Sequence, residues 1–319
     1  MSLLGFLPVA LFLLSLLYLD SYKLVRLRTL LELIVVGIVV AAVSLLINHW
    51  LLRIGMPRRT LTRYAAPAIE ELLKAIPILW MIRTRRIGFL IDAAICGFAV
   101  GAGFALAENL YFFSTLTNAP PALWVVRGFG TAVMHGGTTA IFAIVGKSRK
   151  ASFGLLIAFI LHSLFNHFIL SPAMSTLVIV LILPPLLVIV FGQSEKYLRE
   201  WIGTGFDLDS ELLEVMNSGK FAEARAGQYL QSLREHFDGS VLADMLCYLR
   251  LQTELSLRVK GVLMMRENGF PVKKDAEVGE KLSELRYLKE SIGKTGDLAL
   301  APLLHRTPQD LWQLQVLGE

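Results

Sequence analysis

Several ionisable and amide side chains of this sequence lie inside long apolar segments, where burying them is costly. An ionised side chain at the centre of a bilayer costs on the order of 3 kcal/mol on insertion scales, so it usually faces a protein interior or a water-filled cavity. The residues are Glu70, Glu71 and Lys74 in segment 65–82, Asp92, Glu108 and Asn109 in 88–112, Arg127 and His135 in 122–145, and His162, Asn166 and His167 in 151–170.

Spacing and depth favour a single site shared by these segments. Residues three or four positions apart lie on one face of an α-helix. Because a helix rises about 1.5 Å per residue, Glu70, Glu108, His162 and Asn166 are expected about 6–12 Å below the outer end of their segments, with His135 deeper. The pairs with helical spacing are Glu70 and Glu71 with Lys74, Phe104 with Glu108, and His162 with Asn166.

Histidines and carboxylates contributed by several helices can hold a divalent metal ion with an open position, or can activate water directly. A glutamate in such a site can act as a general base, and an asparagine or histidine can stabilise an oxyanion. The sequence has no H-E-x-x-H and no G-x-S-x-G motif. Cys96 and Asp92 lie in the opposite half of their segment and are excluded. The predicted chemistry is therefore amide hydrolysis by metal- or glutamate-activated water.

The elements that must position this site are predicted to be membrane-spanning helices. A crossing needs roughly 20 mostly apolar residues. The chain of 319 residues is 55% hydrophobic, and its apolar residues are concentrated in the first 193 positions. We expect an all-α polytopic bundle of about seven spans, with the first one retained rather than removed as a signal peptide. The expected spans are 2–19, 29–51, 65–82, 88–112, 122–145, 151–170 and 174–192.

Charged loops predict the orientation of the bundle. Residues 1–193 carry a net charge of +9, and the basic clusters at 83–86, 147–150 and 196–199 are expected to face the cytoplasm. The uncharged loops Thr115–Pro121 and Ser171–Met174 then face outside. Seven spans also place Arg53, Arg58, Arg59 and Arg63 outside, against the usual rule. Either segment 65–82 does not fully cross, or this amphipathic loop lies in the membrane interface.

Residues 194–319 are predicted to form a separate cytoplasmic domain of three to five helices. Their net charge is −4, and apolar residues recur with helical spacing between turns that contain glycine. This region has no phosphate-binding loop, zinc pattern or aromatic-basic stripe, so nucleic-acid binding is not expected. An interaction or regulatory module that binds a cytoplasmic protein is the favoured interpretation.

Four motifs resemble a known family when they are taken in order. They are E-E-x-x-K at Glu70, Glu71 and Lys74, F-x-x-x-E-N at Phe104, Glu108 and Asn109, a single intramembrane histidine at His135, and H-x-x-x-N at His162 and Asn166. This order resembles the PrsW family of intramembrane metalloproteases, related to CAAX-prenyl endopeptidases and bacteriocin-processing proteins. The resemblance covers roughly residues 60–190.

The resemblance implies a membrane-embedded endopeptidase of a bacterial inner membrane that cuts a membrane protein, such as an anti-sigma factor, on its outer side. It implies a divalent metal, with zinc as the expected ion. The implied catalytic residues are Glu70, Glu71 and Asn166. The implied metal ligands are Glu108, His135 and His162, with Lys74, Asn109 and Phe104 in support.

Two other functions remain open at the level of sequence. The same bundle could be a non-catalytic scaffold or an immunity-type protein, since a fold does not guarantee chemistry. It could also be a transporter whose carboxylates bind a cation or relay protons. A transporter is expected to show inverted halves, and no such internal symmetry is visible. A scaffold is expected to lose the polar motifs, and all of them are present.

Overall fold

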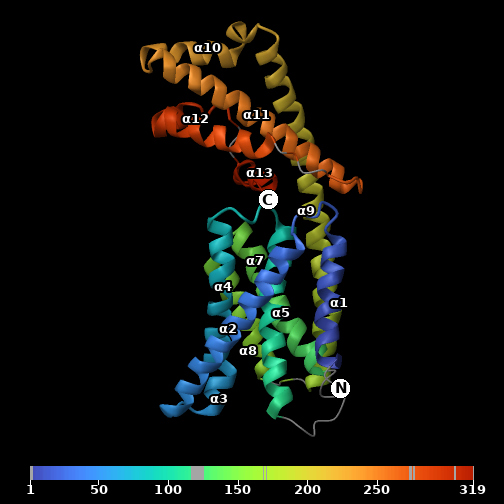
Figure 1. The fold of residues 1–319 in the computed structure, drawn as a ribbon. Coiled ribbons are helices and arrows are strands. Elements are labelled where there is room, and N and C mark those ends of the chain that lie inside the picture. Colours follow the sequence, from blue (N-terminus) through green and yellow to red (C-terminus); the bar gives the residue numbers. More distant parts are fainter. Residues whose placement is uncertain are drawn as a thin grey trace. The chain divides into compact units, whose positions relative to one another are not determined.

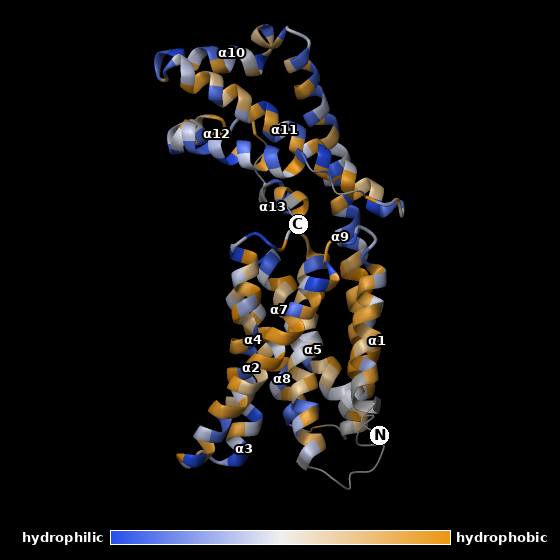
Figure 2. Cartoon of the chain, in the orientation of Figure 1, coloured by the Kyte–Doolittle hydropathy of each residue, from blue (hydrophilic) through white to orange (hydrophobic). Residues whose placement is uncertain are grey.

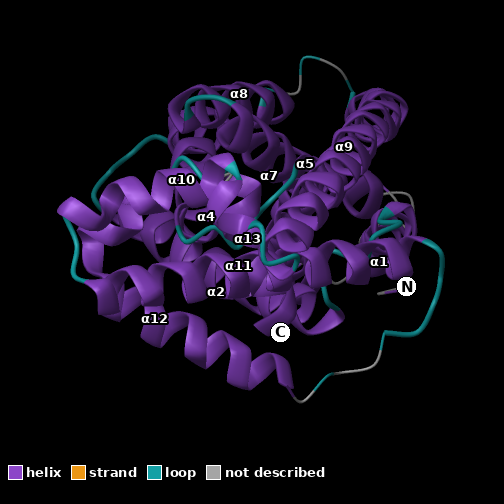
Figure 3. Cartoon of the chain, turned by 90° about the horizontal axis from the view of Figure 1, so that it is seen from above, coloured by secondary structure: helices purple, strands orange, loops and turns teal. Residues whose placement is uncertain are grey.

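The computed structural model describes residues 3–115, 126–167, 169, 171–272, 275, 277–304 and 307–318. Within these ranges every regular element is a helix, and no strand is present (Figure 1, Figure 3). The chain divides into two compact units, Met1–Glu195 and Lys196–Glu319. Helix α9 runs through the boundary between them, and each unit is described by itself.

The first unit is an antiparallel bundle of apolar helices, in which consecutive long helices run in opposite directions (Figure 1). Four helical stretches are long and apolar enough to cross a membrane, namely Leu27–Arg53, Leu90–Ser114, Gly128–Ser148 and Ala173–Asn217, so the chain is a multi-pass membrane protein. Most of the expected outer loop Thr115–Pro121 lies outside the described residues. The bundle comprises α1 (Leu3–Leu19), α2 (Leu27–Arg53), α4 (Ala66–Arg83), α5 (Leu90–Thr115), α7 (Ala132–Ser148), α8 (Ala151–Asn166) and the first part of α9 (Pro172–Asn217).

Helix α5 is the central helix of the bundle, and glycines allow its neighbours to approach closely. A Cβ atom at Gly101 would lie 2.2 Å from the carbonyl oxygen of His135 on α7. A Cβ atom at Gly103 would lie 2.0 Å from the carbonyl oxygen of Ile34 on α2. Both distances are far below van der Waals contact, so only glycine permits this packing. Small residues at helix interfaces are the usual means by which membrane helices approach closely.

Two of the long helices are preceded by a π-helical turn, in which hydrogen bonds join residues i and i+5. The turn η1 (Leu61–Ala65) follows the short helix α3 (Arg58–Thr60) and leads directly into α4. The turn η2 (Arg127–Thr131) leads directly into α7. Such turns are rare, and they often occur at functional sites.

At the opposite end of the bundle, the first turn of α5 is capped by side chains. Asp92 accepts hydrogen bonds from the backbone N–H groups of Gly88 (2.7 Å) and Phe89 (2.8 Å). Ser194 Oγ accepts from the N–H groups of Leu90 (3.2 Å) and Ile91 (3.3 Å). Asp92 therefore satisfies backbone donors that would otherwise be buried without a partner.

The second unit is a helical domain with its own apolar core. It contains the end of α9, followed by α10 (Arg225–Ser232), α11 (Gly239–Glu267), α12 (Glu277–Ala299) and α13 (Pro308–Gly318). Figure 2 shows hydrophilic and hydrophobic residues mixed along these helices, in contrast with the largely hydrophobic helices of the first unit. The core is built from leucines of α11 and α12, among them Leu249, Leu255, Leu285 and Leu288.

A buried lysine lies on α11 of this second unit. Lys260 Nζ donates to Asp209 Oδ2 (2.6 Å), Ser256 Oγ (2.7 Å) and Gln313 Oε1 (3.4 Å). Its ammonium group also lies 5.0 Å from the centre of the Trp201 ring. The three N–H donors of this lysine therefore all have acceptors, and an aromatic face is close to its charge.

Candidate metal centre

Helix α4 carries two neighbouring glutamates and a lysine into the interior of the bundle. Glu71 and Lys74 are three residues apart, so their side chains lie on one face, and both are buried. Lys74 Nζ donates to Glu71 Oε1 at 2.6 Å. An ion pair in a low-dielectric interior is stable only when its geometry is good and further hydrogen bonds satisfy its remaining groups. Further partners of this pair come from α7 and α8.

Glu71 Oε1 joins three helices. In addition to Lys74, it accepts a hydrogen bond from Thr138 Oγ1 on α7 (3.2 Å) and lies 2.7 Å from His162 Nδ1 on α8. A carboxylate can only accept, so Nδ1 of His162 carries a proton, and in the neutral ring Nε2 keeps its lone pair. The second oxygen of Glu71, Oε2, is buried and has no hydrogen-bond partner among the described residues.

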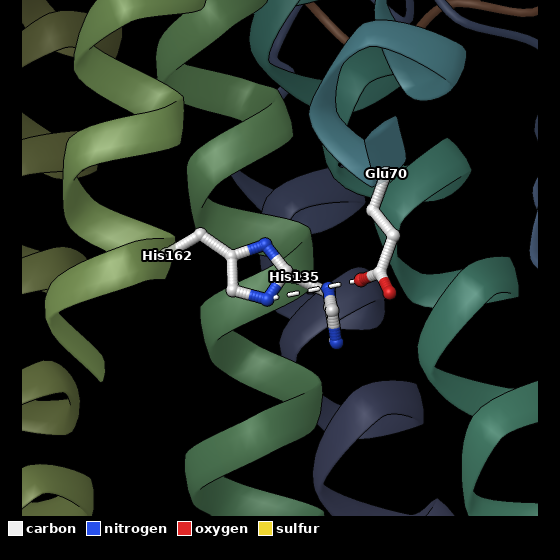
Figure 4. A group of neighbouring side chains, drawn as sticks. All are labelled: Glu70, His135 and His162. Carbon is white, nitrogen blue, oxygen red and sulfur yellow. Dashed lines mark ion pairs between the residues drawn. The ribbon is translucent and has the colours of Figure 1, made fainter. Parts of the chain in front are cut away.

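Glu70 lies beside the free nitrogen of His162. Its Oε2 is 3.8 Å from His162 Nε2, which is too long for a hydrogen bond. Its Oε1 accepts a hydrogen bond from Asn48 Nδ2 on α2 at 3.2 Å. Figure 4 shows the Glu70 carboxylate and the His162 ring directed toward each other, with a dashed line along this contact and the His135 ring next to both.

His135 on α7 lies between the lysine of α4 and a glutamate of α5. Its Nδ1 is 3.3 Å from Lys74 Nζ, and its Nε2 is 2.9 Å from Glu108 Oε2. An ammonium group only donates, so Nδ1 accepts and Nε2 donates to Glu108. The ring also packs against Phe104 (centroids 4.7 Å apart) and against His162 (4.8 Å).

Glu70, His135 and His162 together have the composition of a metal site. One ligand atom from each of the three lies within 4.8 Å of the other two. Two imidazoles and a carboxylate are a donor set that zinc uses in hydrolytic enzymes. Two ligands on one zinc ion are each about 2 Å from it, so a separation of 3.8 Å between Glu70 and His162 fits a shared ion. The unpartnered Oε2 of Glu71 adds to the negative potential at the site.

Glu71 also fits the site as a residue that orients a ligand. A metal-bound histidine usually donates its other ring N–H to a carboxylate or carbonyl, which fixes the tautomer and the ring orientation. The contact between His162 Nδ1 and Glu71 Oε1 at 2.7 Å has this form. The residues present therefore fit a divalent metal ion.

Two carboxylates of the site are partly exposed, whereas the other charged groups are buried. The side chains of Glu71, Lys74, His135 and His162 are at most 2% exposed, whereas Glu70 is 14% and Glu108 29% exposed. Both exposed carboxylates face the same pair of imidazoles. Water and a substrate would therefore reach the site past Glu70 and Glu108.

The structure brings most of the sequence-predicted residues together. Glu70, Glu71, Lys74, Phe104, Glu108, His135 and His162 form one continuous cluster. Asn109, next to Glu108, is buried. Asn166 is different, because its Nδ2 donates to the carbonyl oxygen of Thr62 (3.0 Å), and no contact with the cluster is described. The ligand group contains Glu70, whereas the sequence favoured Glu108 as the carboxylate ligand. The assignment of Glu108 stays a prediction.

Two residues of the site were not singled out from the sequence. Asn48 lies in the apolar run of α2, and its position near the inner face of that helix depends on packing that no pattern revealed. Asn48 is nevertheless an amide inside an apolar segment, and this is the same sequence feature by which Asn166 was predicted. Thr138 is one helical turn from His135, so the spacing of three residues could have suggested it.

Comparison with known protein families gives one match to this chain. The model described as PrsW family intramembrane metalloprotease matches residues 25–191, slightly more than half of the sequence. The matched segment contains all the residues of the cluster. No curated protein and no solved structure matches the chain.

Proposed function

Because this chain belongs to the PrsW family of intramembrane metalloproteases and is therefore a peptide hydrolase, we propose that it cuts a membrane protein at the Glu70–His135–His162 group. The observation that supports this site most directly is the convergence of three potential ligands, within 4.8 Å of one another, from three separate helices. All three residues lie within the segment that matches the family.

The proposed topology has seven crossings and a cytoplasmic C-terminal unit in the inner membrane of a bacterium. Four stretches meet the length and composition of a span. The other three crossings are α1, α4 and α8. Helix α4 has 18 residues, or about 27 Å at the usual rise, which is close to the thickness of the hydrocarbon core. The basic loops then face the cytoplasm, and the metal group lies in the outer half.

Two imidazoles and one carboxylate would hold the ion, with zinc as the expected metal. His162 offers Nε2, because Nδ1 is committed to Glu71. His135 contributes the second ring, and either Glu70 or Glu108 completes the set. A bound zinc ion lowers the pKa of a coordinated water molecule and polarises the carbonyl group of the substrate.

Glu70 is the proposed general base. Its Oε1 is held by Asn48, so Oε2 is the oxygen that accepts a proton from the attacking water. The water oxygen forms a bond to the peptide carbonyl carbon, and the C–N bond then breaks. The proton held on Oε2 passes to the leaving nitrogen, which gives a free amine and a carboxylic acid that keeps the second proton of the water. Glutamate is a common proton carrier in hydrolytic sites.

The other residues of the cluster position these groups. Glu71 fixes the ring of His162, and Lys74 compensates its charge. Phe104 supports the ring of His135, while the neighbouring Asn109 is assigned a supporting role by position alone. Asn166 remains the proposed hydrogen-bond donor to the oxyanion. In this role its Nδ2 would have to leave the carbonyl oxygen of Thr62 and donate to the substrate oxygen.

The proposed substrate is a membrane protein, such as an anti-sigma factor, that is cut near the outer face of the bilayer. The C-terminal unit is the proposed interaction or regulatory module for a cytoplasmic protein. A metal-free hydrolase that uses Glu70 alone is the second candidate. It is favoured by the tautomer of His135, because both nitrogens of that ring already have hydrogen-bond partners.

Metal content and cleavage measured on the same samples test this proposal. The protein would be purified in detergent, and bound zinc and cleavage of a membrane-protein substrate would be determined for wild type, Glu70→Gln, Glu108→Gln and His162→Ala. We expect near-stoichiometric zinc in the wild type and loss of zinc and cleavage in His162→Ala.

The two glutamate variants then identify the carboxylate ligand. Whichever of Glu70→Gln and Glu108→Gln loses zinc removes a ligand, and a variant that keeps zinc but loses cleavage removes a proton carrier. Cleavage by a zinc-free, folded wild type would favour the metal-free mechanism. A folded protein in which all variants cleave normally would contradict the proposed site.

A further inference from the structure

Four arginines lie in the short connection between α2 and α4, and none has an acidic partner among the described residues. Arg53, Arg58 and Arg59 are exposed, and Arg63 is half-buried. No aspartate or glutamate occurs between Glu32 and Glu70. The ion pairs of the described residues include none of these guanidinium groups. The connection therefore presents about four uncompensated positive charges.

Large apolar and aromatic side chains flank these arginines. Trp50 is 58% exposed, Ile54 60% and Tyr64 52%. Figure 2 shows hydrophilic residues at α3, next to the hydrophobic end of α2. Tryptophan and tyrosine are enriched where a membrane meets water, and arginine there pairs with phosphate through its planar guanidinium. This composition fits the headgroup layer of a bilayer better than bulk water.

The same connection is hydrogen-bonded to the helix that carries His162. Ser163 Oγ donates to the carbonyl oxygen of Arg63 (2.6 Å), and Asn166 Nδ2 donates to that of Thr62 (3.0 Å). His167 Nε2 lies 3.0 Å from the hydroxyl of Tyr64. Through η1 the connection continues directly into α4, which carries Glu70 and Glu71. It thus joins the helices that supply opposite sides of the proposed metal group.

We propose that Arg53, Arg58, Arg59 and Arg63 bind the phosphate groups of anionic lipids, and that this binding holds α4 and α8 in the register that the site needs. Lipid is favoured over an acidic protein segment because Trp50 and Tyr64 are residues of the bilayer boundary, where lipid phosphate is always adjacent. The regulatory part rests on the proposed function, whereas the binding part does not. The surface also accounts for arginines on the side of the bundle where basic loops are uncommon.

Two readouts in vesicles test the proposal separately. The protein would be reconstituted in phosphatidylcholine vesicles that contain from zero to about 40% phosphatidylglycerol. The first readout is the preference of the protein for spin-labelled phosphatidylglycerol over spin-labelled phosphatidylcholine, which does not depend on catalysis. The second is the rate of cleavage of one fixed substrate. The test variant is Arg58→Gln/Arg59→Gln, and the matched control is Arg83→Gln/Arg85→Gln, which removes two exposed charges at the other end of α4.

We expect the wild type and the control to prefer the anionic lipid roughly two- to fivefold and the test variant to lose most of this preference. Cleavage by the wild type should rise with phosphatidylglycerol, and that increase should be absent in the test variant. Inorganic phosphate added to neutral vesicles should not replace the lipid.

Three results would overturn the proposal or its parts. If the wild type and the test variant had the same lipid preference, Arg58 and Arg59 would not bind anionic lipid, and the proposal would fail. The variant could lose the lipid preference while the cleavage rate does not depend on lipid in any form. The arginines would then bind lipid without controlling the site. Slower cleavage by the variant in purely neutral vesicles, with no lipid preference in any form, would assign the arginines to an acidic segment of the substrate protein instead. A protein that shows the lipid preference but cuts nothing would contradict the proposed function and leave the surface intact.

Discussion

Among the described residues, each unit of the molecule contains one fully buried lysine, and the two lysines have similar first partners. Lys74 in the membrane bundle and Lys260 in the C-terminal unit both donate to a carboxylate oxygen at 2.6 Å. Each also has an aromatic ring close to its ammonium group, Phe104 at 5.1 Å and Trp201 at 5.0 Å. Sequence spacing alone would not tell these two clusters apart.

The difference lies in the groups that surround each lysine. Asp209, Ser256 and Gln313 satisfy Lys260, and this cluster contains no histidine. Around Lys74 there is an excess of groups that can bind a cation or carry a proton. They are the unpartnered Oε2 of Glu71, two histidines, and the carboxylates of Glu70 and Glu108. A closed cluster stabilises a fold, whereas an open one retains capacity for chemistry.

The largest expected effect comes from removing the proposed base of the open cluster. Glu70→Gln should lower kcat by roughly 10²- to 10⁴-fold, because the amide has the same shape but cannot accept a proton. Thermal unfolding should change little. The control is Glu32→Gln, whose carboxylate forms an exposed pair with Arg28. If Glu70→Gln cleaved as fast as the wild type, the cluster around Lys74 would have no more evidence for a catalytic role than the cluster around Lys260.

The second prediction concerns the closed cluster. Lys260→Met should destabilise the C-terminal unit by about 3 kcal/mol, because it leaves Asp209 without its counter-charge in a largely buried position. Hydrogen exchange of α11 would measure the loss in the full chain, and cleavage per folded molecule should not change. Lys281→Met, which breaks the more exposed pair with Glu254, should cost less than about 1 kcal/mol. Equal effects of the two variants would contradict the comparison.

A smaller effect is expected when the orienting carboxylate of the open cluster is changed. Glu71→Gln should weaken zinc binding about 10- to 100-fold, because residues that orient a ligand typically have this influence. Competition against a chelator of known affinity would measure it. Thr138→Val removes only the longer hydrogen bond to Glu71 and should have a weaker effect. If Glu71→Gln bound zinc as tightly as the wild type, the role of Glu71 would be limited to a structural ion pair with Lys74.

The smallest of these effects is expected at Asn48. Loss of a hydrogen bond to a charged group corresponds to about tenfold in rate, so Asn48→Ala should lower kcat by roughly that factor and leave KM unchanged. Its neighbour His49 is exposed, and His49→Ala should behave like the wild type. A rise in KM without a fall in kcat would mean that Asn48 contacts the substrate and does not position Glu70.

The membrane fold could be predicted from sequence in large part. Apolar length alone predicted the helices that correspond to α2, α5, α7 and the start of α9. It could not show that α5 is central, because that depends on backbone contacts at Gly101 and Gly103, and small residues are common in any membrane bundle. The π-helical turns also left no recognisable pattern.

The site was predictable as a set of residues but not as a geometry. Helical spacing placed Glu71 with Lys74 on one face, and the structure has this pair. Spacing could not show which carboxylate approaches which imidazole, since that depends on how four helices rotate against one another. The side chain of Asn166 was expected in the site, yet its position next to Thr62 follows from a packing contact that lies 104 residues away in sequence.

The π-helical turn η1 has a consequence for chain length. Because a π-turn accommodates one more residue than an α-turn, deletion of a single residue from Leu61–Ala65 should restore ordinary α-helical winding. Five residues of this turn thus take the place of four in an α-helix, and the segment before it would keep nearly the same face relative to Glu70. Deletion of one residue from the α-helical stretch between Ala66 and Glu70 would instead rotate that segment by about 100° around the helix axis and move Arg58 and Arg59 off their face. The π-turn is therefore the position at which the chain can lose one residue while the arginines and the metal group keep their relative placement.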